Sequence, residues 1–147
     1  MTNFFVSGIV GTLILLTTQL ACAGDQTLQI NDPWIREAPP NAKALAAYMI
    51  IDNQSSQQRT LIAATCSAFK KVEIHRSLHH DGMMSMEQQH ELIIAANEQK
   101  ILAPGGYHLM LMHPKQTLKE GDQVDLILQF ANGEELTLTT PVKRQLK

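Results

Sequence analysis

The chain has 147 residues, with 12 Lys and Arg against 14 Asp and Glu and a formal net charge of −2 at pH 7. This length fits one domain built around a single hydrophobic core. The nearly balanced charge leaves no basic surface of the kind that nucleic acid requires, so we expect no nucleic-acid partner.

The N-terminal segment has the features of a secretory signal peptide. Residues 4–20 are apolar or uncharged, and the small residues at 21–23 follow as a peptidase cleavage signal. The apolar run is too short and too rich in threonine for a membrane span. We therefore expect residues 1–23 to be removed by cleavage near Ala23. Residues 24–147 would then be one periplasmic domain without a membrane span.

The two cysteines are relevant to other interpretations of the N-terminal segment and of the function. An uncleaved anchor helix and a lipid attached to Cys22 are both possible, although Gln19 stands where a lipobox usually has Leu. Cleavage would leave Cys66 alone in an apolar run, where we expect a small buried side chain and no intramolecular disulfide. A blue-copper site needs a cysteine ligand, and Cys66 lies nine residues before His75 on a separate predicted strand. Nothing places a histidine and a carboxylate beside this thiol, so we expect no enzyme.

Short apolar runs alternate with turn residues from residue 27 onward, as in all-β domains. The predicted strands are residues 27–30, 34–35, 44–52, 61–65, 71–76, 83–89, 99–102, 107–112, 124–130 and 136–139. A break is expected at 31–33. The Asn132-Gly133 pair predicts a type I′ hairpin turn, because both residues tolerate positive φ. Regular strand spacing without a helical period favours a β-sandwich or barrel.

Histidine and methionine are concentrated in the second half of the chain, which holds all six histidines and five of the seven methionines. Successive side chains of a strand point to opposite faces. The apolar residues next to His108 and Met110 take the core face of their strand, so His108 and Met110 share the opposite face. His75 also faces away from the core, and a turn at 81–82 would fold Met86 back beside it. Four donors can thus converge from three strands.

Two imidazoles and two thioethers form a soft, neutral ligand set that favours Cu(I) over Zn(II), Mg(II) or Ca(II). The sequence therefore predicts a Cu(I) site made of His75, Met86, His108 and Met110. Four neighbouring residues are candidates for extra donors, a docking surface or a solvated loop: His79, His80, Met83 and Met84. For the two histidines we favour the loop, because exposed polar residues at a turn tip need no further cause.

The spacing of the four predicted ligands, H-x10-M-x21-H-x-M, resembles the signature of the PCuAC family of periplasmic copper chaperones. Residues 32–36, 47–49, 104–112 and 118–122 are similar to that family as well. The resemblance implies a Greek-key, cupredoxin-like β-barrel with an exposed Cu(I) site. It also implies transfer of copper to an acceptor protein, either a cytochrome c oxidase subunit with its binuclear copper centre or another copper chaperone.

Two departures from the family pattern limit what the resemblance implies. Ser77 stands where many members have a methionine, and residues 142–147 lack the His- and Met-rich tail of some members. We therefore expect no second copper site at the C-terminus. Two other functions stay open: a copper storage or resistance protein, and a metal-free periplasmic domain whose methionine face binds another protein.

Overall fold

The computed structural model describes residues 28–144, which form ten strands and contain no helix long and apolar enough to cross a membrane. The predicted signal peptide, its cleavage site and Cys22 lie outside the described residues. The strands are β1 (Leu28–Arg36), β2 (Ala44–Asn53), β3 (Arg59–Cys66), β4 (Phe69–His80), β5 (Met83–Gln89), β6 (Leu92–Ile94), β7 (Glu98–Leu102), β8 (Tyr107–Pro114), β9 (Gln123–Phe130) and β10 (Glu135–Lys143). The prediction of an all-β domain is confirmed.

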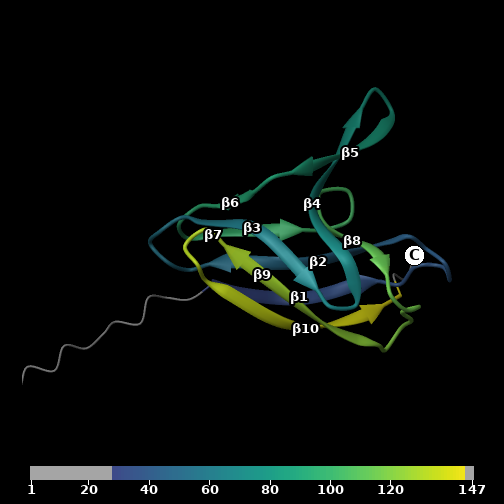
Figure 1. Cartoon of the computed structure of the whole chain (residues 1–147). Coiled ribbons are helices and arrows are strands. Elements are labelled where there is room, and N and C mark those ends of the chain that lie inside the picture. Colours follow the sequence, from purple (N-terminus) through teal and green to yellow (C-terminus); the bar gives the residue numbers. More distant parts are fainter. Residues whose placement is uncertain (1–27, 145–147) are drawn as a thin grey trace, which may run out of the picture.

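The strands form one mixed sheet in the order β5-β4-β8-β7-β2-β1-β10-β9-β3-β6, and β8 also pairs with β2. Most neighbours are antiparallel, but β1 with β10 and β7 with β8 are parallel. The sheet curls around a single hydrophobic core (Figure 1). Ile35 and Leu109 enter this core from one half of the sheet, and Leu61 and Leu126 enter it from the other.

Two parts of the strand prediction were wrong. The expected break at 31–33 is a β-bulge inside β1, where the register shifts between Asn31 and Trp34 and Asp32 has a φ of 48°. A bulge accommodates a proline because the ladder of hydrogen bonds is already disrupted there. The prediction also missed β6, whose three residues are too few for a clear alternation to show in the sequence.

Two hairpins were predicted correctly, one of them with the wrong turn. Asp81 and Gly82 between β4 and β5 both have positive φ, 49° and 78°, as a two-residue type I′ turn requires. Between β9 and β10 only Gly133 has positive φ, so the Asn132-Gly133 pair does not form the expected type I′ turn. Four residues, 131–134, lie between the two strands, and the N–H of Gly133 donates to the carbonyl oxygen of Phe130, as in a type I turn that is followed by glycine.

Cys66 ends β3 and is buried in the core, as expected from its apolar surroundings. Burial raises the pKa of its thiol, because the thiolate would lose its hydration. The thiol is therefore held in its neutral form, which is a poor nucleophile and a poor metal ligand.

Candidate metal site

The two predicted histidine ligands lie directly opposite each other on neighbouring strands. His75 of β4 pairs in register with His108 of β8, and the centroids of their rings are 5.9 Å apart. Side chains that are opposite in an antiparallel pair lie on the same face of the sheet. A bond from a metal ion to an imidazole nitrogen is about 2 Å long, so one ion can lie between two rings at this separation.

The two predicted methionine ligands extend this face on either side. Met110 follows His108 by two residues on β8 and lies opposite Glu73 of β4. Met86 of β5 lies opposite Ser77 of β4. Because alternate residues of a strand share a face, all four predicted ligands lie on one face of three adjacent strands. The structure thus places all four residues on the same face of neighbouring strands.

Hydrogen bonds fix which nitrogen of each ring carries the lone pair. Nδ1 of His108 lies 3.1 Å from the carbonyl oxygen of Gly106, which can only accept, so Nδ1 carries the proton. Nε2 of His75 lies 2.8 Å from a carboxylate oxygen of Glu73 and donates to it in the same way. The lone pairs of the neutral rings are therefore at Nε2 of His108 and Nδ1 of His75. Both are the nitrogens that a metal ion would bind.

One of these two lone pairs is buried without a partner. Nδ1 of His75 is shielded from solvent and has no hydrogen bond. A buried polar atom without a partner costs free energy, and native structures rarely contain one. Bonding to a metal ion would satisfy this nitrogen, so the histidine pair fits a metal site better than a purely structural role.

Glu73 orients the first histidine. Its carboxylate accepts hydrogen bonds from Lys71 and His75, and these bonds lower its pKa, Lys71 having the larger effect. The carboxylate therefore stays ionised and holds the His75 ring in one tautomer. A carboxylate behind a ligating histidine is common in metal sites, where it sets the ring orientation and raises its basicity. The sequence placed Glu73 on this face, but its role depends on a contact within the strand that spacing alone does not reveal.

His108 is buried and His75 is partly buried, whereas Met86 is exposed. His108 is 3% exposed, and the centroid of its ring lies 6.4 Å from that of Tyr48. Met86, in contrast, is 55% exposed. Burial lowers the pKa of His108, and its hydrogen bond to Gly106 only partly offsets this. The expectation of an exposed site is thus correct for Met86 and wrong for His108, beside which β2 places the ring of Tyr48, whereas the side chain of His75 keeps 14% of its exposure.

A pocket of about 490 Å³ is lined by three of the four residues, Met86, His108 and Met110, but not by His75. Its wall includes His108, Met110, Met86 and Met84, together with residues of the loops after β1 and before β8. Within residues 28–144 no group of three or more His, Cys, Asp or Glu side chains could hold a metal ion. Met86 and Met110 share the face of the two histidines, and thioether ligands favour a soft cation.

The sequence matches the family described as "Putative lipoprotein LpqE-like" over residues 28–142. A relative from Leifsonia xyli subsp. xyli, named "Putative lipoprotein Lxx21020", is 28% identical over 139 residues, which is 92% of this chain and 82% of the relative.

Solved structures with the same fold include that of CuI-DR1885 from Deinococcus radiodurans. It has 28% sequence identity and a TM-score of 0.70, and the match covers 88% of this chain and 87% of that one. The copper-bound PCuAC domain from PmoF2 has 20% identity and a TM-score of 0.68, with 82% of this chain and 96% of the domain covered. The cupredoxin-like fold implied by the resemblance is thereby confirmed.

Proposed function

The chain belongs to the LpqE-like family, and from this premise we propose that it is a Cu(I) chaperone. The proposed ligands are His75, Met86, His108 and Met110. The names of the neighbours support the metal, since CuI-DR1885 is a Cu(I) form and the PmoF2 domain is copper-bound.

The observation that carries this proposal is the pair of imidazole lone pairs on one face of the sheet. His75 and His108 are in register, and the hydrogen bonds to Glu73 and Gly106 leave one unprotonated nitrogen on each neutral ring. Both rings are therefore in the tautomers that binding requires, so little reorganisation is needed when the ion arrives. The thioethers of Met86 and Met110 complete a neutral set of four donors.

Neutral donors suit a protein that must release its cargo. Cu(I) keeps its single positive charge in this set, and no ligand proton has to leave the site except from a protonated histidine. Met86 is the most exposed of the four ligands, so it is the donor that an incoming thiolate or imidazole of a partner displaces first. The copper stays cuprous throughout, and no bond of a substrate is made or broken, so the protein acts as a carrier and not as an enzyme.

We further propose that the carrier works in the periplasm and delivers copper towards the binuclear centre of cytochrome c oxidase, directly or through another copper chaperone. The lipoprotein names of the family and of the Leifsonia relative support an exported protein. The resemblance of the ligand spacing to PCuAC chaperones supports the acceptor.

Competition with a colorimetric Cu(I) chelator under anaerobic conditions tests the ligand set. We expect the parent chain to hold one Cu(I), and the Met110→Leu and His75→Ala variants to bind it at least about tenfold more weakly, a loss of about 1.4 kcal/mol. Met112→Leu is the matched control, because Met112 lies on the same face of β8 one pair further from the histidines. Unchanged affinity in both ligand variants would reject the site.

A further inference from the structure

The β4–β5 hairpin projects from the body of the domain and carries donors beyond the proposed site (Figure 1). Along β4 and β5 the pairs His75 with Gln88, Ser77 with Met86, and His79 with Met84 follow one another on the same face. Methionine and histidine thus continue from the site to the hairpin tip.

The outer residues of this series have no packing role. Met84 is 62% exposed, and β5 buries none of its seven residues. A methionine gains stability in a protein by burial, so an exposed methionine on an edge strand contributes little to folding. Met84 nevertheless lines the same pocket as Met86, Met110 and His108. Its thioether therefore lies at the mouth of the proposed site.

Distances along the strands make a stepwise path possible. Pairs two residues apart are separated by about 7 Å, so the Met86 pair lies about 7 Å from the tip pair and a similar distance from the histidines. Methionine has a long, flexible side chain, and Met86 can therefore serve an ion at either position. The outer position offers fewer donors than the inner one and is open to solvent, which favours weaker binding and faster exchange.

We propose that His79 and Met84, sharing Met86 with the inner site, form a second and weaker Cu(I) site through which copper enters and leaves. This inference rests on the proposed Cu(I) site and adds the route to it. Copper moves by ligand exchange alone: a bond to the thioether of Met84 forms as the bond to a donor of the partner breaks, and the ion stays cuprous. In the next step the bonds to His79 and Met84 break as bonds to the inner histidines form, while the thioether of Met86 stays bound to the ion.

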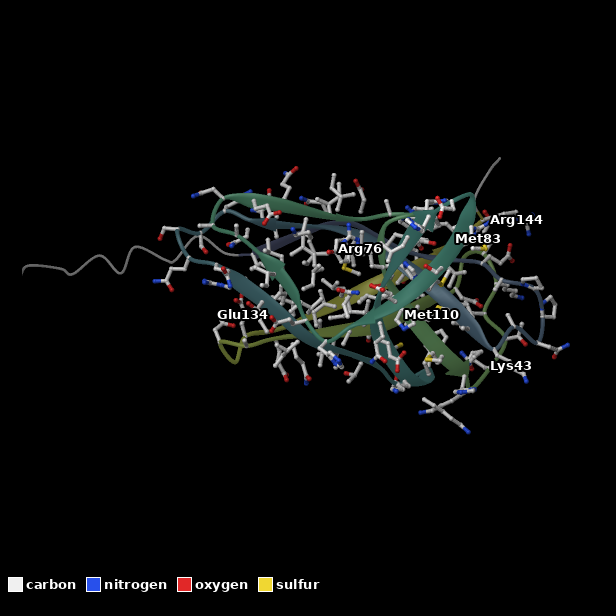
Figure 2. The ribbon with its side chains drawn as sticks, turned by 90° about the horizontal axis from the view of Figure 1, so that it is seen from above. Lys43, Arg76, Met83, Met110, Glu134 and Arg144 are labelled. Carbon is white, nitrogen blue, oxygen red and sulfur yellow. The ribbon has the colours of Figure 1, made fainter. Side chains whose placement is uncertain are left out.

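The other face of the hairpin supplies a matched control. Met83 is 71% exposed and lies opposite His80, so it resembles Met84 in exposure and in its histidine partner. Because adjacent residues point to opposite faces, Met83 points away from the face that carries the proposed ligands. Figure 2 shows Met83 and Met110 in the same half of the molecule, with Glu134 towards the other end.

Stopped-flow transfer of Cu(I) from the loaded full chain to excess bicinchoninate tests the route. We expect Met84→Leu and His79→Gln to slow transfer about tenfold, which corresponds to about 1.4 kcal/mol in activation free energy, with the equilibrium affinity of the inner site unchanged. Met83→Leu should transfer copper at the parent rate. Equal rates in all three variants and the parent would overturn the proposal.

Titration of protein labelled with ¹³C at the methionine methyl groups is the second measurement. The first equivalent of Cu(I) should shift the signals of Met86 and Met110, and excess Cu(I) should then shift Met84 but not Met83. Equal shifts of Met83 and Met84, or no shift of either, would contradict the outer site. These results would reject the outer site alone. The proposed function itself would be rejected by a different result, namely an unchanged affinity for the first equivalent of Cu(I) in Met110→Leu.

Discussion

At the scale of single residues, the site is determined by contacts that hold two imidazole rings in place. Gly106 accepts two hydrogen bonds through its carbonyl oxygen, one from the backbone N–H of Ser77 and one from the ring of His108. Glu73 performs the same task for His75. The sequence showed the ligand types and their spacing, but it could not show these orienting contacts, because they depend on how the strands pair.

Glu73→Gln should weaken Cu(I) binding without unfolding the domain. The amide keeps the size of the carboxylate but no longer holds the Nε2 proton of His75 with a charge, and loss of such a partner costs about 10- to 100-fold in metal affinity. Chelator competition measures the effect. Lys71→Met is the control, since it removes the other partner of Glu73 and should change the affinity much less. An affinity equal to that of the parent in Glu73→Gln would show that His75 needs no orienting group.

The metal-free protein should lose stability as the pH falls through the histidine range. Burial holds the folded-state pKa of His108 below the ordinary 6.5, so below that pH the unfolded chain binds a proton that the folded chain does not. Each pH unit of acidification between the two pKa values therefore lowers the free energy of unfolding. The contribution of His108 to this loss is at most about 1.4 kcal/mol per pH unit.

Urea unfolding at pH 7 and pH 5.5 tests this dependence on the parent and on His108→Asn. The variant should show the smaller loss of stability between the two pH values. If His108→Asn lost as much stability between the two pH values as the parent, the pH dependence would come from another group.

At the scale of the elements, three adjacent strands contribute all four proposed ligands. The strand β4 carries His75 and lies between β5 and β8 in the sheet. Met86 of β5 therefore lies on one side of it, and His108 and Met110 of β8 lie on the other. The sequence predicted β5 with its observed bounds, and the strand begins directly after the predicted turn at 81–82. It predicted β4 only as residues 71–76, since the exposed end of β4 up to His80 lacks apolar alternation.

The turn that carries Met86 into place can be tested through Gly82. Its φ of 78° is strained for a residue with a Cβ, so Gly82→Ala should lower the stability of the hairpin by about 1 to 2 kcal/mol. Because Met86 lies on this hairpin, the affinity for Cu(I) should fall as well.

Gly121→Ala is the control for that variant, because Gly121 has a φ of 93° in the loop between β8 and β9, which carries none of the four proposed ligands. We expect urea unfolding to show a loss of stability in both variants, and chelator competition to show weaker Cu(I) binding only in Gly82→Ala. Weaker binding in both variants to the same extent would mean that the affinity follows global stability and not the hairpin.

At the scale of the whole molecule, one curled sheet has its core on one face and the proposed site on the other. Leu109 and Leu111 of β8 enter the core, whereas His108 and Met110, which alternate with them along the strand, face the site. The same alternation in the sequence predicted the all-β fold and the face that carries the proposed ligands. The position of Tyr48 beside His108 was not predictable from the sequence. Tyr48 belongs to β2, which is distant in the sequence, and it reaches His108 only through the pairing of β2 with β8.

X-ray absorption of the chain loaded with one equivalent of Cu(I) tests the central claim most directly. The account predicts a mixed shell of two nitrogen and two sulfur donors around each copper, and the loss of one sulfur in Met110→Leu. The buried thiol of Cys66 should contribute no sulfur. A shell of nitrogen and oxygen alone, or a sulfur count that Met86→Leu and Met110→Leu both leave unchanged, would contradict the account.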